Sequence, residues 1–151
     1  MCLHDPLIDG RISPTIMRTG CWECPIVNDV LDLLGKHDNA TLIDIGANIG
    51  YYSLAAAASG AATRVHAFEA SPRNALLLQE SVIRSGLEGA ITLHAVALGA
   101  APGMLRLGAN RRNQGGLHHI AAAGGTQVAR VAFDSVLPPA TGPVFVKMDV
   151  E

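Results

Sequence analysis

The chain alternates between apolar residues at helical spacing and short, continuous apolar runs. Apolar positions recur every three or four residues over 25–35, 49–59 and 71–86, which predicts three helices. Pro25 and Pro72 lie in the first turns of two of these helices. Backbone N–H groups make no intrahelical hydrogen bond there, so proline, which has no N–H, is tolerated. Glycine ends each of the three patterns, as expected at a helix C-terminus.

The continuous apolar runs predict buried strands, which cover residues 41–46, 63–69, 91–98 and 143–149. Helices and strands therefore alternate along the first part of the chain. Alternation of this kind predicts an α/β fold, with a parallel sheet and right-handed crossovers. His66 and His94 fall inside two of the strands and are expected to be hydrogen-bonded core residues.

The pattern changes before the last predicted strand. Residues 104–107 and 126–131 alternate between apolar and polar side chains, which predicts an inserted β-hairpin. The Gly- and Asn-rich stretch between them, residues 108–125, is long enough to be a functional loop. A short helical turn is expected over 134–137.

Length and composition limit the classes of protein. A chain of 151 residues is about one domain, and we expect residues 1–24 to be an irregular arm and 25–151 to form the domain. A net charge of -2 with 49% hydrophobic residues excludes disorder and favours neither a nucleic-acid binder nor an anionic-membrane binder. The start of the chain lacks the pattern of a secretory signal, and no apolar run approaches the ~20 residues of a membrane helix. We therefore expect a cytoplasmic protein.

The cysteines and a histidine pair raise the question of a metal. Cys2, Cys21 and Cys24 are an odd number, which argues against a disulfide framework and for a reducing compartment. Cys21 and Cys24 have the spacing of a redox or zinc motif, but no second pair completes four zinc ligands. We therefore expect that this spacing arises by chance and marks neither kind of site. His118 and His119 are adjacent in an extended segment and point to opposite faces. No metal site is expected.

The segment with the most chemistry is the glycine-containing turn after the first strand. Gly46 and Gly50 allow close approach of a ligand to the backbone, next to the free N–H groups of a helix N-terminus. Glu69 ends the following strand, 19 residues beyond Gly50, where an acidic side chain can accept hydrogen bonds from both ribose hydroxyls. A dinucleotide fingerprint would need glycine at Asn48 and Tyr51, so the turn suits adenosine with an amino-acid tail better than a pyrophosphate. The alternative is that the glycines only permit a tight turn.

Four ordered segments resemble the FkbM family of S-adenosylmethionine-dependent methyltransferases. They are 42–53 (LIDIGANIGYYS), 67–72 (AFEASP), 95–99 (AVALG) and 146–151 (VKMDVE), and residues 22–25 (WECP) resemble a family segment that enters the first helix. The resemblance implies a Rossmann-like parallel sheet in the order 3-2-1-4 for the part present, with flanking helices. The sequence departs from the family in having Cys24 before the proline and Met148 where isoleucine is commoner.

The resemblance also assigns roles to residues. S-adenosylmethionine is the implied cofactor, with Asp44, Gly46, Asn48 and Gly50 around its methionine portion and Glu69 on its ribose.

Further lining residues follow from the same resemblance. Tyr51 and Tyr52 would line the pocket, ordinary packing on the sheet being the alternative for Tyr52. Ala97 and Leu98 would border the adenine through backbone groups. Asn113 resembles an Asn-x-Gly segment of the family and would face the substrate, unless it is a solvated loop residue.

Two carboxylates are candidates for the chemical step. Methyl transfer needs the nucleophile and the methyl group in line, and a hydroxyl nucleophile benefits from a base that takes its proton. Asp149 ends the fourth strand, where methyltransferases commonly keep a residue near the reacting methyl, and Glu151 follows it. General-base catalysis by Asp149 is a hypothesis, since neither carboxylate has a visible partner in the sequence.

The resemblance implies that the chain stops after the fourth strand of a longer sheet and lacks most of the acceptor half. Strand 144–148 would then be an open edge, prone to self-association. The expected function is methylation of a small-molecule or glycan hydroxyl. One alternative is an NAD-dependent oxidoreductase with a degenerate loop, although this sequence lacks the glycines and the Tyr-x-x-x-Lys pair of that class. The other alternative is a non-catalytic nucleotide-binding module.

Overall fold

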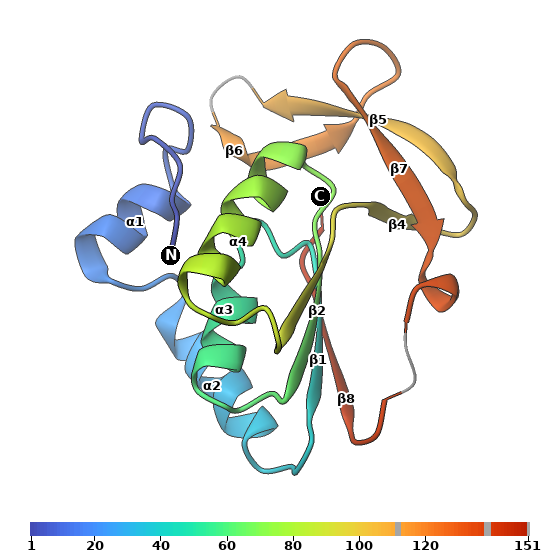
Figure 1. Ribbon diagram of the computed structural model, residues 1–151. Coiled ribbons are helices and arrows are strands. Elements are labelled where there is room, and N and C mark those ends of the chain that lie inside the picture. The colour runs from blue at the N-terminus through green and yellow to red at the C-terminus, as the bar shows by residue number, and fades with distance from the viewer. Residues whose placement is uncertain (111–112, 138–139, 151) are drawn as a thin grey trace.

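The computed structural model describes residues 1–110, 113–137 and 140–150, with the backbone alone for 109, 110 and 113–119. Its central element is a parallel sheet (Figure 1). The strands, in spatial order, are β3 (Ile91–His94), β2 (Arg64–Phe68), β1 (Thr41–Ile45) and β8 (Val144–Met148). This order confirms the predicted α/β class and the 3-2-1-4 arrangement.

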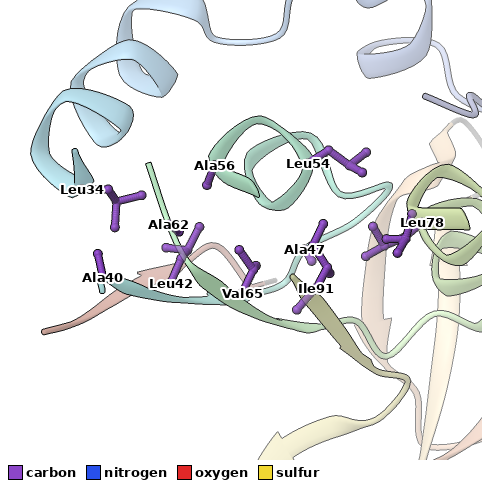
Figure 2. Packing of buried hydrophobic residues seen from close by; sticks show 12 residues of the cluster. Leu34, Ala40, Leu42, Ala47, Leu54, Ala56, Ala62, Val65, Leu78 and Ile91 are labelled. Carbon is purple, nitrogen blue, oxygen red and sulfur yellow. The ribbon is translucent and has the colours of Figure 1, made fainter. Parts of the chain in front are cut away.

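Helices cover one face of this sheet, as Figure 1 shows. They are α2 (Cys24–Leu34), α3 (Tyr51–Ala58) and α4 (Pro72–Arg84), each within two residues of the range expected from the sequence. Leu34, Ala56 and Leu78 reach from the helices to Leu42 and Val65 on the strands, and all five are at most 1% exposed (Figure 2). Burying a leucine side chain of this kind contributes about 2 kcal/mol, so this cluster anchors the helices on the sheet.

The opposite face of the sheet is only partly covered. Ile43, Ile45 and Phe68 are buried there under apolar side chains of the segments 96–98 and 133–137. The apolar side chains of β8 extend the same face and stay half-exposed; they are Val144 (45%), Val146 (53%) and Met148 (65%).

A second sheet is built from the inserted segment. Its strands, in spatial order, are β4 (Ala97–Gly99), β7 (Thr126–Ala132), β5 (Gly103–Asn110) and β6 (Asn113–Ile120). β5 pairs antiparallel with β7 as the predicted hairpin requires, and the 3-10 turn η1 (Phe133–Ser135) follows. The insertion is thus larger than a hairpin, and it lies beyond the carboxyl ends of the parallel strands (Figure 1).

Two expectations about this region are wrong. Residues 91–98 are not one strand: β3 ends at His94, the N–H of Val96 donates to the His94 carbonyl at 2.9 Å, and β4 then joins the second sheet. Apolar residues lie on both sides of the break because Ile91 is buried in the first sheet and Ala97 in the second. Residues 108–125 are not all loop either, because β6 forms there by pairing with β5.

The N-terminal arm contains a helix that the sequence analysis missed. Helix α1 (Ile12–Thr19) begins under the buried carboxylate of Asp9, which accepts hydrogen bonds from the backbone N–H groups of Arg11, Ile12 and Ser13. Burial alone would raise the pKa of Asp9, but these hydrogen bonds outweigh it and lower the pKa. The arm is therefore an ordered part of the fold.

The cysteine spacing is not a chance feature. Cys21 and Cys24 are joined by a disulfide across the start of α2, with their Cα atoms 5.8 Å apart. The expectation that the spacing arises by chance is therefore wrong, because the bond joins Cys21 to Cys24, the first residue of α2.

The two strand histidines are paired, as expected of core residues. His66 Nδ1 lies 3.2 Å from His94 Nε2, and the His94 ring stacks on Phe68 with the ring centroids 4.3 Å apart. Burial lowers the pKa of both imidazoles, with smaller contributions from Arg64 at His66 and from His66 at His94. Both rings are therefore harder to protonate than a free imidazole.

None of the helices in the described ranges is long and apolar enough to span a membrane.

Candidate functional site

The turn between β1 and α3, residues 46–50 and hereafter the glycine loop, is held in a conformation that few residues adopt. Gly46, Asn48 and Gly50 have φ angles of 76°, 53° and 85°. Asparagine is among the non-glycine residues that tolerate this left-handed region, and the Asn48 Oδ1 accepts a hydrogen bond from the N–H of Ile49 at 2.8 Å. The sequence thus favours a tight turn that brings backbone close to any ligand.

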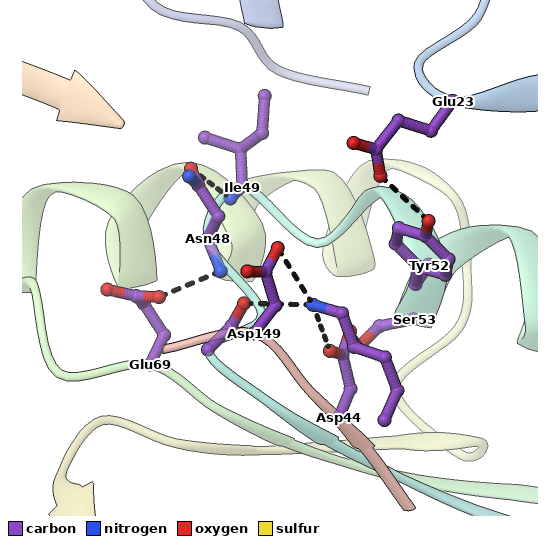
Figure 3. A network of polar contacts seen from close by, with 10 residues as sticks. Glu23, Asp44, Asn48, Ile49, Tyr52, Ser53, Glu69 and Asp149 are labelled. Atoms are coloured by element: carbon purple, nitrogen blue, oxygen red, sulfur yellow. Dashed lines mark hydrogen bonds and ion pairs between the residues drawn. The ribbon is translucent and has the colours of Figure 1, made fainter. Parts of the chain in front are cut away.

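Glu69, at the end of β2, is connected to the glycine loop. Its Oε2 accepts a hydrogen bond from Asn48 N–H at 2.8 Å (Figure 3). Its Oε1 accepts one from Ser71 N–H at 2.7 Å. The side chain is 8% exposed. Burial raises the pKa of Glu69, while hydrogen bonds from Ser71, Asn48 and Asn74 oppose that shift. At least one acceptor site of the carboxylate stays open for a hydroxyl of a ligand.

Asp44 and Lys147 form a buried charge pair below the glycine loop. The Lys147 ammonium lies 3.1 Å from Asp44 Oδ1, donates to the Gly46 carbonyl at 3.2 Å, and stands 4.0 Å from Asp149 Oδ2. Ser53 donates to the other Asp44 oxygen at 2.7 Å (Figure 3). Lys147 therefore connects the glycine loop to the end of β8.

The N-terminal arm reaches the same place. Tyr52, in the first turn of α3, donates its hydroxyl to Glu23 Oε2 at 2.9 Å, and the Lys147 ammonium lies 5.0 Å from the Tyr52 ring centroid. Burial raises the pKa of Tyr52, as does the hydrogen bond to Glu23. Arg11 stacks on Trp22, 5.6 Å from its ring centroid. The arm thus forms a wall beside the glycine loop.

These elements enclose a cavity of about 830 Å³. Its walls come from the arm, the glycine loop, the ends of β2 and β8, and the second sheet. Polar groups gather at the loop, whereas the second sheet contributes apolar side chains; these are Leu98, Leu105, Leu107 and Ile120. One end of the cavity is therefore suited to hydrogen bonding and another to apolar or aromatic groups.

The cavity lining includes many of the residues singled out in the sequence, namely Gly46, Asn48, Tyr51, Tyr52, Glu69, Ala97, Leu98 and Asp149. Asp44 and Gly50 lie behind the loop instead: the Asp44 carboxylate is engaged by Ser53 and Lys147, and Gly50 packs on Leu78. Glu151 and the side chains of Asn113, His118 and His119 lie outside the described residues.

Several residues of the site were not identified from the sequence. Lys147 could have been found as the lone charge in an apolar strand. Trp22 and Glu23 could have been found from their place in the segment that resembles the family. Asn74 lines the cavity from α4 and gave no signal, because a polar residue in an amphipathic helix is normally solvated.

Within the described part of the chain, no three His, Cys, Asp or Glu side chains are close enough together to hold a metal ion.

Comparison with known families identifies the domain. The profile of the methyltransferase FkbM domain matches residues 44–151, which include the glycine loop, Glu69 and the end of β8. The chain belongs to the FkbM methyltransferase family. Its match begins at Asp44, so the arm and α2 lie outside the part that defines the FkbM domain.

A solved structure agrees with the fold. An FkbM methyltransferase from Methylobacillus flagellatus KT superposes with a TM-score of 0.54 at 22% identity, over 74% of this chain and 26% of that one. The PRMT1 enzyme–prozyme complex of Trypanosoma brucei, solved with AdoHcy, gives 0.43 at 22% identity over 59% and 27%. Trm5 of Methanocaldococcus jannaschii, solved with adenosine, gives 0.38 at 18% identity over 54% and 27%. The last two scores are too low to support an argument.

The chain thus spans about a quarter of the FkbM structure that it matches. No curated protein matches the sequence.

Proposed function

We propose that this FkbM domain binds S-adenosylmethionine in the cavity beside the glycine loop and takes part in methyl transfer to a hydroxyl group. The observation that carries the proposal is the hydrogen bond between Glu69 and Asn48 N–H, which fixes a carboxylate at the end of β2 directly beside the glycine loop. A carboxylate in this place on an α/β sheet is suited to the two hydroxyls of a ribose.

The residues present fit the proposed cofactor. Glu69 offers acceptors to the ribose, and the apolar residues Val96, Leu98 and Phe133 line the cavity where an adenine ring would lie beside the second sheet. Tyr51 lines the cavity next to the glycine loop, where the amino-acid portion would lie. The cavity of about 830 Å³ leaves room for an acceptor beside the cofactor.

The chain's own residues would position the reactants. When bound, S-adenosylmethionine supplies a methyl group on a positively charged sulfonium. Asp149, with 73% of its side chain exposed, faces the cavity at the end of β8, and Lys147 holds its carboxylate 4.0 Å away. In the proposed step, the acceptor oxygen bonds to the methyl carbon, the S–CH3 electron pair returns to sulfur, and the hydroxyl proton passes to Asp149.

The proposed acceptor is a small molecule or glycan with a free hydroxyl. Its pocket would lie between the arm residues Trp22 and Glu23 and the second sheet. We propose no nucleic-acid partner, because the charged residues lining the cavity are mixed in sign and form no basic patch; they are Arg11, Glu23, Glu69, Lys147 and Asp149.

Calorimetric titration tests the binding. S-adenosylhomocysteine should bind the wild-type chain, and Glu69→Ala should weaken it at least about tenfold, since a hydrogen bond to a charged group contributes about 1.5–3 kcal/mol. Glu80→Ala is the matched control, because Glu80 lies on the exposed face of α4 and pairs only with Arg84 among the described residues. Equal loss in both variants would contradict the proposal.

The same titration separates the alternatives. Binding of NAD without S-adenosylhomocysteine would support an oxidoreductase, and binding of neither a non-catalytic module. For the chemical step, release of S-adenosylhomocysteine in the presence of a panel of polyols and glycans should depend on Asp149. An Asp149→Asn variant with full activity would overturn the role of Asp149 as base.

A further inference from the structure

The second sheet turns apolar side chains towards the cavity. Leu105 and Leu107 are two residues apart on β5, so they lie on the same face, and Leu107 is paired directly with Ile120 of β6. All three side chains, hereafter the apolar face, line the cavity. Ile120 is 73% exposed, and Leu105 and Leu107 are half-buried. Apolar side chains left open inside a cavity are typical of a site for an apolar ligand.

The apolar face lies beyond the place proposed for the adenine. That place is beside Leu98 on β4, and in the second sheet β7 separates β4 from β5, with β6 further out still (Figure 1). At about 4.8 Å between neighbouring strands, β5 and β6 are about 10–14 Å from β4. A purine ring held at Leu98 therefore leaves the apolar face free for a second molecule.

The N-terminal arm supplies an aromatic wall to the same cavity. Trp22 lines the cavity, and the Arg11 guanidinium lies over its ring, 5.6 Å from the centroid. The next residue, Glu23, accepts a hydrogen bond from the Tyr52 hydroxyl at 2.9 Å, which fixes this part of the arm on α3. Indole and guanidinium are both planar groups against which an aromatic ring packs favourably.

Few polar side chains are available to a ligand between these two walls. The apolar face offers no hydrogen-bonding side chain, and Glu23 and Lys147 are already engaged by Tyr52 and Asp44. Asp149 is the exception, with 73% of its side chain exposed at the end of β8. Hydroxyl groups that leave water without a new partner are costly, so a polyol is disfavoured here. A molecule with one hydroxyl beside Asp149 and an apolar body avoids that cost.

The proton transfer favours a phenol among such molecules. A carboxylate is a weak base, and a phenol is a much stronger acid than an aliphatic alcohol. Transfer of the hydroxyl proton to Asp149 therefore costs less from a phenol. An aromatic ring also suits a wall made of Trp22 and Arg11 better than a saturated ring does.

We propose that the acceptor is a phenol, whose ring lies between Trp22 and the apolar face and whose hydroxyl points to Asp149. This inference rests on the proposed function for the transfer step and narrows its acceptor. The phenol oxygen bonds to the methyl carbon, the S–CH3 electron pair returns to sulfur, and the phenolic proton passes to Asp149. The products are an aryl methyl ether and S-adenosylhomocysteine.

Calorimetric titration of the full chain tests the inference, with and without S-adenosylhomocysteine. The probes are thymol, an alkylated phenol; menthol, its saturated counterpart; and inositol, a polyol. With S-adenosylhomocysteine present, thymol should bind about threefold to tenfold more tightly than menthol, the effect of one aromatic contact, and inositol should not bind. Trp22→Leu should remove most of the preference for thymol and keep the binding of menthol, because a leucine remains apolar but offers no ring.

Ile120→Gln and Met104→Gln are a matched pair on the two faces of the second sheet. Met104 is 57% exposed, lies on the face opposite Leu105 and does not line the cavity. Ile120→Gln should weaken thymol and menthol at least about threefold through lost apolar contact, and Met104→Gln should weaken neither. Both side chains are exposed, so both variants should fold.

Three results would overturn the inference: equal binding of thymol and menthol, an unchanged preference for thymol in Trp22→Leu, or equal effects of the two glutamine variants. If the wild type binds S-adenosylhomocysteine, these results leave the proposed function intact. The expected pattern with thymol in a chain that does not bind S-adenosylhomocysteine would overturn the proposed function and leave the phenol site. Binding of neither thymol nor S-adenosylhomocysteine would overturn both.

Discussion

Lys147 and Asp44 are lateral neighbours on β8 and β1, and their charged groups meet at 3.1 Å. The Asp44 side chain is fully buried, and that of Lys147 is 18% exposed. The pair stands directly under the backbone of Gly46, so an ion pair inside the sheet supports the loop where the proposed cofactor binds.

Removal of the ammonium should destabilise the whole domain. Lys147→Met leaves Asp44 as a buried carboxylate without its counter-charge, and loss of one partner of a buried pair costs about 3–5 kcal/mol. Urea unfolding measures this change. The double variant Lys147→Met/Asp44→Asn also lacks the carboxylate charge. Its loss of unfolding free energy should therefore be well below the sum of the losses in the two single variants. Additive losses would show that the two residues do not interact.

Gly46 should tolerate no side chain. Its φ is 76°, and a Cβ built on it overlaps the carbonyl oxygen of Asp149. Gly60 has nearly the same φ of 74° but nothing within 4 Å of a built Cβ, which makes it a matched control. Gly60→Ala should cost about 1 kcal/mol for the left-handed backbone alone. Gly46→Ala should cost about 3 kcal/mol in the same unfolding assay, because overlap adds to the backbone term. Equal costs would mean that the end of β8 is free to move away.

Binding and stability should respond to pH in opposite directions through Glu69. Its pKa is raised above 4.5, chiefly by burial. In the proposed site the ionised carboxylate would accept the ribose hydroxyls, so the affinity for S-adenosylhomocysteine should increase as the pH rises through this raised pKa and then level off. The folded chain holds the proton that the unfolded chain has lost, so the contribution of Glu69 to stability should decrease over the same interval. Both dependences should be absent in Glu69→Gln, and their persistence there would assign them to another group.

The paired histidines should make the fold sensitive to acid. The pKa values of His66 and His94 are lowered from 6.5, so the unfolded chain takes up protons first and stability falls as the pH drops below about 6.5. Melting curves between about pH 5 and about pH 8 should show a loss of at least about 2 °C in the wild type. The melting temperature of the double variant His66→Gln/His94→Gln should fall less over the same pH range. His37→Gln, at an exposed position, should behave as the wild type.

The edge of the first sheet should pair with a second copy of the chain. β8 has a partner on one side only among the described strands, and Val146 is 53% exposed on the open apolar face. Sedimentation should show a self-associated species that Val146→Lys converts to monomer, since edge lysines oppose strand pairing. Ile83→Lys, at a residue 51% exposed on α4, is the control. A monomeric wild type would contradict this prediction.

Features set by neighbours in the sequence were predictable. The glycine loop, the acidic residue that ends β2 and the proline at the start of α4 each act within a few residues of chain. The parallel order of the first sheet followed from the alternation of helices and strands together with the family resemblance.

Features set by distant partners were not predictable. The apolar run 91–98 gave no sign that it leaves one sheet at His94 for another, and the Gly-rich β6 has little strand propensity of its own. His4 and Asn74 meet across 70 residues of sequence, and neither residue type at its position distinguishes a buried pair from two solvated side chains.

The pairing of β1 with β8 has a consequence for how the chain acquires its structure. About one hundred residues separate the two strands, so their contact closes a long loop and should form late in folding. During synthesis β1, β2, β3 and the helices between them can assemble while the Asp44 carboxylate still lacks its ammonium. Docking of β8 then neutralises that carboxylate and brings Asp149 to the cavity in the same event. The proposed cofactor pocket is therefore completed only once β8 has docked, and a ligand that binds there should stabilise the docked state.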